Sequence, residues 1–137
     1  MTMQGGCLCG AIRYQCSQKP ILQFNCHCRD CQKSSGGPYV PIAFFAMESV
    51  TISGEPRYFQ SLGRSGKAIR RGFCPNCGSR LFGLLDIMPA LIAISAGTLD
   101  DPAMFRPRAN LFASHAAPWD HLDSTLTTFA DNAPQGA

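Results

Sequence analysis

Residues 74–78 read Cys74-Pro75-Asn76-Cys77-Gly78. Two cysteines separated by two residues can turn both sulfur atoms toward one metal ion, and the following glycine supplies the positive φ that such a turn often needs. This pair gives only two ligands, whereas a tetrahedral structural site needs four. The natural second pair is Cys7 and Cys9, which stand in the stretch CLCG near the N-terminus. We therefore predict a closed structural zinc site that ties the N-terminal part of the chain to its middle.

The Cys74 and Cys77 pair has an alternative interpretation as a thioredoxin-like redox pair. A redox pair of that kind normally opens a helix within a β-α-β unit. Nothing around residues 68–85 has a helical pattern. The metal interpretation is therefore favoured.

A third group of cysteines lies in the segment Cys26-His27-Cys28-Arg29-Asp30-Cys31, which offers three thiols within six residues. Three protein ligands with one open position are typical of a reactive zinc site. Two alternatives remain: a closed metal site completed by His27 or His115, and reduced thiols that hold no stable metal. We predict that Cys26, Cys28 and Cys31 bind a second, catalytic zinc, which three ligands on one loop would hold in a labile way.

Composition and length place the chain among ordinary globular proteins. It has 137 residues, 45% of them hydrophobic and 15% charged, so a single domain over residues 1–137 is expected. The net charge of +3 is too small to indicate nucleic-acid binding. We see neither a signal-peptide pattern nor an apolar run of membrane-spanning length, so a cytoplasmic location without membrane contact is expected. Thiols stay reduced there, and eight cysteines then favour metal or catalysis over disulfides.

Short apolar or alternating runs bounded by turn residues predict a mainly β fold with few or short helices. Pro41 favours an edge or bulged position for its strand, residues 32–37 read as a loop or a single helical turn, and the tail from about residue 130 is expected to fray. A hairpin is expected around residues 53–56. The expected strands cover residues 10–16, 39–45, 50–53, 57–60, 68–73, 80–85, 91–95 and 109–114.

Two further features bear on function. Cys16 is in phase with the apolar residues Ile12 and Tyr14, so it is expected in the core rather than at a metal. A basic group is a candidate anion-binding rim for a carboxylated substrate, although a solvated basic face explains it equally well. The members of this group are Arg64, Lys67, Arg70 and Arg71.

The ordered set of motifs resembles the glutathione-dependent formaldehyde-activating family, which includes the centromere-protein-V type domains. The resemblance spans about residues 5–122 and rests on GCLCGAI at 6–12, CHCRDCQK at 26–33, FCPNCG at 73–78, GTLDD at 97–101 and Pro118-Trp119. It implies several coiled antiparallel β-sheets around a structural zinc held by Cys7, Cys9, Cys74 and Cys77. It also implies a catalytic zinc on Cys26, Cys28 and Cys31. The last strand departs from the pattern, because many members carry His-aliphatic-aromatic where this chain has Asn110-Leu111-Phe112.

The activity implied by this resemblance is carbon–sulfur bond chemistry, in which formaldehyde and glutathione form S-hydroxymethylglutathione or the reverse. We therefore expect a zinc-dependent carbon–sulfur lyase acting on a small thiol adduct, with glutathione among the candidate thiols. The alternative is a non-catalytic zinc module that binds a partner or a small thiol. Three clustered ligands without an obvious fourth favour the enzyme.

Overall fold

The computed structural model describes residues 2–133 and arranges them in two β-sheets with one α-helix. The smaller sheet has the order β1-β2-β5, and the larger has the order β11-β10-β3-β4-β9-β8-β7-β6. The prediction of a mainly β fold with several sheets and little helix is confirmed. Not every pairing is antiparallel, because β10 runs parallel to both β3 and β11. The strands are β1 (Met3–Gly6), β2 (Arg13–Cys16), β3 (Leu22–Cys26), β4 (Val40–Ala46), β5 (Val50–Ser53), β6 (Arg57–Leu62), β7 (Ala68–Phe73), β8 (Arg80–Leu85), β9 (Leu91–Ser95), β10 (Ala109–Leu111) and β11 (Thr127–Thr128).

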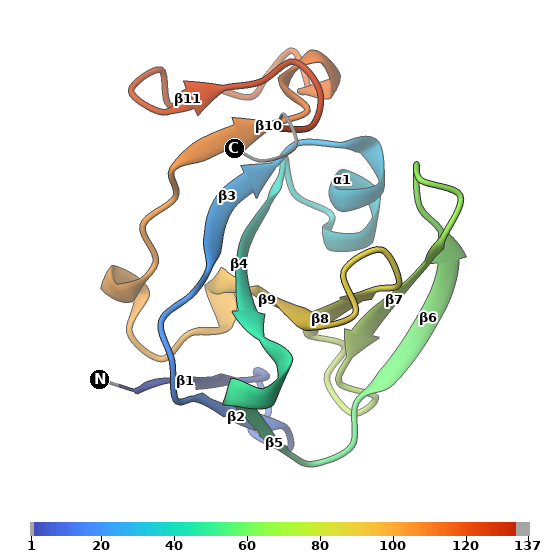
Figure 1. Ribbon diagram of the computed structural model, residues 1–137, viewed down its shortest axis with the longest axis vertical. Coiled ribbons are helices and arrows are strands. Elements are labelled where there is room, and N and C mark those ends of the chain that lie inside the picture. Colours follow the sequence, from blue (N-terminus) through green and yellow to red (C-terminus); the bar gives the residue numbers. More distant parts are fainter. Residues whose placement is uncertain (1, 134–137) are drawn as a thin grey trace.

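The larger sheet curves around the helix α1 (Arg29–Ser35), with β3 and β4 on one side of it and β6 and β7 on the other (Figure 1). The helix begins where the Cys28 sulfur accepts a hydrogen bond from the Cys31 N–H, and it ends at Gly36 with φ of 75°. A loop or single turn was predicted only from residue 32, so the helix starts earlier than expected. The cysteine side chain supplies the N-terminal cap that serine or aspartate usually provides.

Two apolar clusters lie on opposite faces of the larger sheet, and β4 contributes to both. Phe45 is fully buried in the cluster between the two sheets, where Tyr14 and Phe82 also meet edge to face with ring centroids 5.7 Å apart. Phe44 points to the other face, where it packs with the second cysteine group. A strand covered on both faces needs a continuous apolar run, which explains the sequence VPIAFF at residues 40–45.

The prediction of a hairpin around residues 53–56 is wrong. The strands on either side of this turn exist, but β5 pairs with β2 and β6 pairs with β7. Val50 and Ile52 pack on the core between the sheets, and the Tyr58 ring lies over Gly72 of β7. Burial of these side chains against different parts of the protein outweighs the tendency of the turn sequence at residues 53–56 to form a hairpin.

The edge position expected for Pro41 is also wrong, since β4 lies between β3 and β9. Pro41 pairs with Asn25 of β3, but the β4–β9 ladder begins only at Ile42. The missing N–H of proline is therefore tolerated at the end of a strand that has only one neighbour at that point.

Hydrogen bonds hold the C-terminal segment to the rest of the protein as far as residue 131, which is further along the chain than the sequence suggested. The backbone N–H groups of residues 112, 113 and 114 donate to the carbonyls of Asp131, Phe129 and Ala130. The fraying expected from about residue 130 thus does not apply to residues 130 and 131, and residues 134–137 lie outside the described residues. Within residues 2–133, no helix has the length and apolar character needed to cross a bilayer.

Two phenylalanines of the larger sheet provide a matched test of this core. Phe45 is 0% exposed and Phe59 is 66% exposed. We predict that Phe45→Ala lowers the free energy of unfolding by about 3–5 kcal/mol through lost burial and a cavity, whereas Phe59→Ala changes it by less than about 1 kcal/mol. Denaturant unfolding of the metal-loaded proteins measures both. Equal losses would contradict the assignment of Phe45 to the core.

Candidate metal centres

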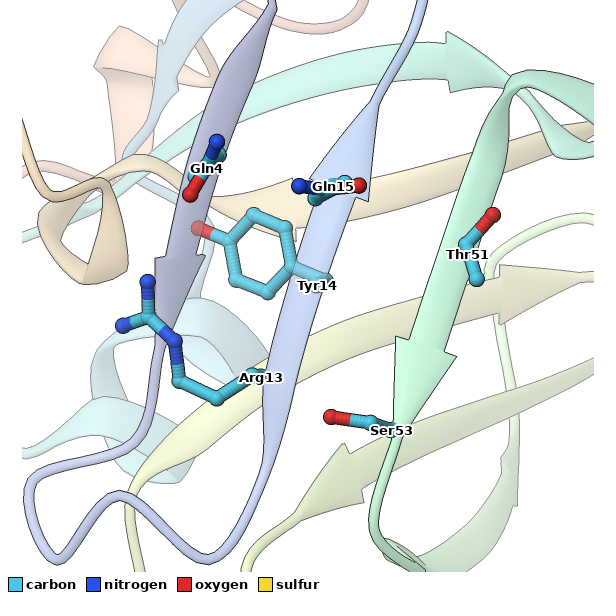
Figure 2. Close-up of a pocket in the computed structure, with 6 residues that line it drawn as sticks. All are labelled: Gln4, Arg13, Tyr14, Gln15, Thr51 and Ser53. Atoms are coloured by element: carbon cyan, nitrogen blue, oxygen red, sulfur yellow. The ribbon is translucent and has the colours of Figure 1, made fainter.

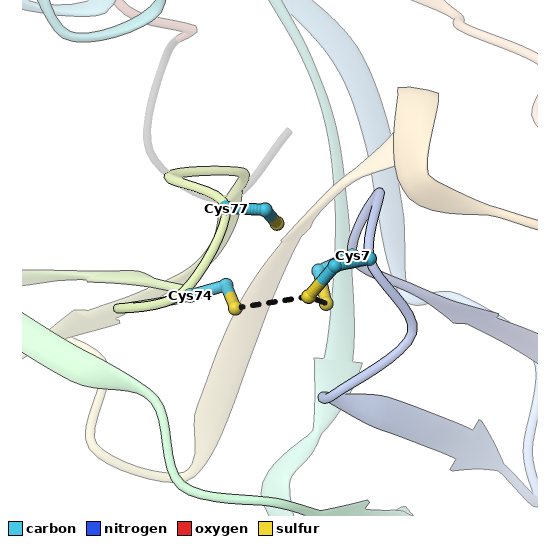
Figure 3. Close-up of side chains that lie close together, drawn as sticks. Cys7, Cys74 and Cys77 are labelled. Atoms are coloured by element: carbon cyan, nitrogen blue, oxygen red, sulfur yellow. Dashed lines mark hydrogen bonds between the residues drawn. The ribbon is translucent and has the colours of Figure 1, made fainter.

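The first cysteine group joins the loop between β1 and β2 to the turn after β7. Figure 3 shows Cys7 facing Cys74 and Cys77 across this junction, and the sulfur atoms of these three and Cys9 all lie within 4.8 Å of one another. The Cys7–Cys9 sulfur separation is 3.6 Å and the Cys9–Cys74 separation is 3.8 Å. Tetrahedral zinc with bonds of about 2.3 Å needs sulfur–sulfur edges of about 3.8 Å, whereas a disulfide would be about 2.05 Å. The residues present therefore fit a tetrahedral metal.

The two loops of this group are built in a similar way. The Gly78 N–H donates to the Cys74 carbonyl at 2.8 Å, and the Gly10 N–H donates to the Cys7 carbonyl at 3.1 Å. Both glycines have positive φ, 79° at Gly78 and 82° at Gly10. A side chain would be strained at either position, so each glycine permits the turn that directs a pair of sulfurs to one point.

Several hydrogen-bond donors point at these sulfurs. The Ile12 N–H lies 3.2 Å from the Cys7 sulfur, and the Asn76 side-chain amide lies 3.2 Å from the Cys9 sulfur. The hydroxyl and backbone N–H of Ser79, together with the Cys9 backbone, lower the pKa of Cys77 to about 5. Ser79 also accepts a hydrogen bond from the Leu8 N–H at 3.0 Å and so links the two loops. Sequence reasoning missed Ser79, whose only signal is its place directly after the CPNCG motif.

The second group consists of Cys26 at the end of β3, Cys28 before α1 and Cys31 in its first turn. Their sulfur atoms also lie within 4.8 Å of one another, and no further His, Cys, Asp or Glu ligand atom of residues 2–133 belongs to the group. The thiols of Cys26 and Cys31 point at Cys28, as do the N–H groups of residues 30 and 31, and they lower its pKa. Three thiols that can converge on one ion fit a metal with one position left for another ligand.

His27 stands between two of these cysteines but turns into the protein. Its ring is buried, with Nδ1 3.1 Å from the Asp120 carboxylate and Nε2 3.3 Å from the Asn110 side-chain oxygen. Nδ1 and the carboxylate are within ion-pair distance without hydrogen-bond alignment. The other histidine considered as a fourth ligand, His115, has its ring beside Arg64 and Phe112. Asn110 and Asp120 were not predicted as partners, because nothing in a lone asparagine or aspartate marks it as such.

A cavity of about 200 Å³ opens beside the second group. Cys28, Arg29 and Asp30 line it from the start of α1, while residues 62–64 line it from the turn between β6 and β7. The Cys28 sulfur thus belongs to a group that could hold a metal and also borders an accessible pocket.

The structure separates the four basic residues that the sequence grouped. Arg64 lines the cavity. Arg71 lies 3.9 Å from the Asp30 carboxylate and so faces the same side. Arg70 points to the opposite face, as alternate strand residues must, and pairs with Asp86 at 2.9 Å. Lys67 lies beside the turn and makes no ion pair within the described part of the chain.

Arg80 is a further cation near this site that the sequence interpretation missed. It follows the CPNCG motif at the start of β8 and donates a hydrogen bond to the Ser34 hydroxyl of α1. Together with Arg71 it connects the β6–β8 part of the sheet to the helix that carries Cys31.

A second depression, of about 240 Å³, lies on the small sheet (Figure 2). Its charged and phenolic groups already have internal partners: Arg13 pairs with Asp100, and the Tyr14 hydroxyl lies 2.7 Å from that of Thr98. It holds no cysteine, so we do not regard it as the chemical site. Its lining residues are Gln4, Arg13, Tyr14, Gln15, Thr51 and Ser53.

Comparison with known proteins identifies a family and relatives of this chain. The family model described as glutathione-dependent formaldehyde-activating enzyme matches residues 2–115. This chain belongs to that family. A relative from Halomonas elongata, named "Putative glutathione-dependent formaldehyde-activating enzyme", is 25% identical over 130 residues, which cover 90% of this chain and 83% of the relative. A crystal structure of a Rhodobacter sphaeroides protein has a TM-score of 0.57 at 17% identity and covers 74% of this chain and 93% of that chain, a likeness that shows the fold alone.

The first cysteine group predicts a clear difference between two cysteine variants. We expect Cys77→Ser to remove one metal equivalent per chain and to lower the melting temperature, because three ligands hold the ion more weakly than four. Cys16→Ala removes a fully buried thiol outside both groups and should leave the metal content unchanged. Elemental analysis of gently purified proteins measures this. Loss of metal from the Cys16 variant would contradict the ligand assignment.

The buried contact of His27 gives a second prediction. Asp120→Ala leaves the His27 Nδ1 without its carboxylate in a site where both side chains are less than 10% exposed. We expect it to lower the free energy of unfolding by about 1–3 kcal/mol, because it removes the carboxylate that lies within ion-pair distance of a buried ring nitrogen. Asp86→Ala breaks a half-exposed pair and should cost less than about 1 kcal/mol. Denaturant unfolding measures both costs, and a cost below about 1 kcal/mol for Asp120→Ala would contradict a structural role for Asp120.

Proposed function

We propose that this protein is a zinc-dependent enzyme that makes or breaks a carbon–sulfur bond in a small thiol adduct, of the S-hydroxymethylglutathione synthase kind. One observation carries the proposal: three cysteine sulfurs can converge on one ion beside an accessible cavity, without a fourth ligand atom from residues 2–133. Such a site can receive a sulfur ligand from a substrate. The family name, which includes glutathione and formaldehyde, supports the same chemistry.

The two cysteine groups have different roles in this proposal. Cys7, Cys9, Cys74 and Cys77 hold a structural zinc, since four sulfurs complete a tetrahedron. Cys26, Cys28 and Cys31 hold a catalytic zinc. Thiolate-rich sites favour zinc over harder metals. Reduced cysteines of this number also suit a cytoplasmic location.

In the reaction, the sulfur of the substrate thiol attacks the formaldehyde carbon, and a carbon–sulfur bond forms as the C=O π bond breaks. The proton lost from the thiol ends on the carbonyl oxygen, which becomes a hydroxyl. The reverse reaction releases formaldehyde and the free thiol, so the atoms balance in both directions. When bound, zinc supplies Lewis acidity that favours the ionised thiol. The chain orients the three cysteine ligands through the end of β3 and the Cys28 cap of α1. The pocket wall formed by residues 62–64 limits the directions from which the adduct can approach.

The basic residues complete the proposal as contacts for an anionic thiol. Arg64 lines the pocket and Arg71 lies on the same side, so both are placed to attract a carboxylate. Lys67, near the β6–β7 turn, can add to the local positive potential. Arg70 is paired with Asp86 and does not face the pocket, so in this proposal it contributes only to the positive potential around the site.

Replacing Cys28 tests the enzyme directly. We predict that Cys28→Ser reduces catalysed exchange between glutathione and S-hydroxymethylglutathione by at least about 100-fold, because the reactive site loses a metal ligand. Exchange NMR under substrate equilibrium measures the rate, while circular dichroism and metal analysis should show an intact fold and a retained metal at the four-cysteine site.

Two outcomes would contradict the proposal. Unfolding of the Cys28 variant would make this group structural rather than catalytic. Zinc-loaded wild-type protein that binds thiols but accelerates no adduct reaction would instead indicate a non-catalytic zinc-binding module.

A further inference from the structure

Arg64 differs from the other arginines near the second cysteine group in how it is held. Its guanidinium carbon lies 5.1 Å from the centre of the Phe112 ring, and its Nη2 lies 3.1 and 3.2 Å from the two ring nitrogens of His115. The ion pairs within residues 2–133 do not include Arg64. A guanidinium fixed by two rings, with no carboxylate partner in that part of the chain, keeps donors available for an anion.

The Phe112 ring occupies its place at an energetic cost. Phe112 has φ of 57° and ψ of 40° and is the one residue other than glycine with positive φ in the described chain. This conformation costs about 1–3 kcal/mol and tends to occur at ligand-binding sites. It is maintained because the Phe112 N–H donates to the Asp131 carbonyl and the Ala113 N–H donates to the Phe129 carbonyl. The bound C-terminal segment thus holds the ring on which Arg64 rests.

His115 is fastened to the cysteine loop itself. The side-chain amide of Gln32, a buried residue of α1, donates to the His115 carbonyl at 2.9 Å and to the His27 carbonyl at 2.6 Å. His27 lies between the ligands Cys26 and Cys28. The segment that holds Arg64 is therefore joined through one amide to the segment that holds the reactive sulfurs.

We propose that Arg64, held by Phe112 and His115, is the specificity-determining residue that binds the carboxylate of a thiol substrate whose sulfur lies at the Cys28 side of the same cavity. This inference rests on the proposed thiol chemistry. It adds that the site selects thiols with a negative charge. Cys28 and Arg64 line one cavity of about 200 Å³. A short thiol that carries a carboxylate is therefore a suitable probe of this part of the site.

The cavity volume and the two groups that line it, a thiol and a guanidinium, decide the choice of probes. 3-Mercaptopropionate has a thiol and a carboxylate on a short chain, and 2-mercaptoethanol has a neutral hydroxyl in place of the acid. We expect zinc-loaded wild-type protein to bind 3-mercaptopropionate at least about 10-fold more tightly than 2-mercaptoethanol in calorimetric titrations. Arg64→Gln should weaken binding of the acid by about 10- to 100-fold, the effect of losing charge-assisted hydrogen bonds, and should leave 2-mercaptoethanol binding within about 2-fold.

Two matched variants sharpen the assignment. Arg64→Lys keeps the charge but loses the planar fork, so it should recover only part of the preference for the acid. Arg13→Gln removes an arginine of the small sheet that is paired with Asp100 and lies outside this site, and it should change neither affinity by more than about 2-fold. Zinc content is measured after each titration, so that removal of metal by the thiol is not mistaken for weak binding.

The outcomes separate this inference from the proposed reaction. Equal binding of the two thiols by the wild-type protein, or an equal loss of both in Arg64→Gln, would overturn the role of Arg64 even if adduct exchange is catalysed. Charge-selective binding that disappears in Arg64→Gln would establish the role even if no adduct reaction is accelerated. In that case the enzyme proposal alone would fail.

Discussion

Convergence of the Cys7, Cys9, Cys74 and Cys77 sulfurs within 4.8 Å is the constraint on which the two-sheet arrangement depends. The two pairs are separated by more than sixty residues, so bringing them together costs chain entropy, although this cost grows only slowly with loop length. A metal ion that binds the folded group stabilises the folded state by mass action. The junction places the small sheet against the larger one and allows the apolar cluster that contains Phe45 and Tyr14 to close.

The second cysteine group uses the same ligand chemistry in a different setting. Its three sulfurs come from one short segment, but its pocket also needs the β6–β7 turn, which the curvature of the larger sheet brings to the start of α1 (Figure 1). Arg71 and Arg80 connect the two sides through Asp30 and Ser34. One group is thus completed by four cysteines and fastens sheets together, while the other is left with three and borders an accessible cavity. The difference in ligand number is the physical basis of the proposal that the first group is structural and the second reactive.

Strand positions followed from the sequence where apolar runs have turn residues at both ends. The expected bounds of residues 68–73, 80–85 and 91–95 agree with β7, β8 and β9. β3 was missed because its sequence LQFNC alternates poorly and ends in Cys26, the first residue of the second cysteine group. β1 and β11 were missed because they have only four and two residues, and strands this short do not show a recognisable alternation of apolar and polar residues. Pairing was less predictable than position: β5 and β6 lie in different sheets, since burial of their side chains against distant elements outweighs the turn between them.

The sequence by itself determined the mainly β class and the three cysteine clusters, because ligand spacing and strand periodicity are local properties that a few adjacent residues express. Only the tertiary structure decided which basic residues face the pocket, since Arg70 and Arg71 are neighbours in the chain yet point to opposite faces of β7. Only the tertiary structure gave His27 its Asp120 partner and set Arg64 against Phe112. These contacts join residues 48 to 93 positions apart. They depend on sheet curvature and on the path of the C-terminal segment, which no local pattern encodes.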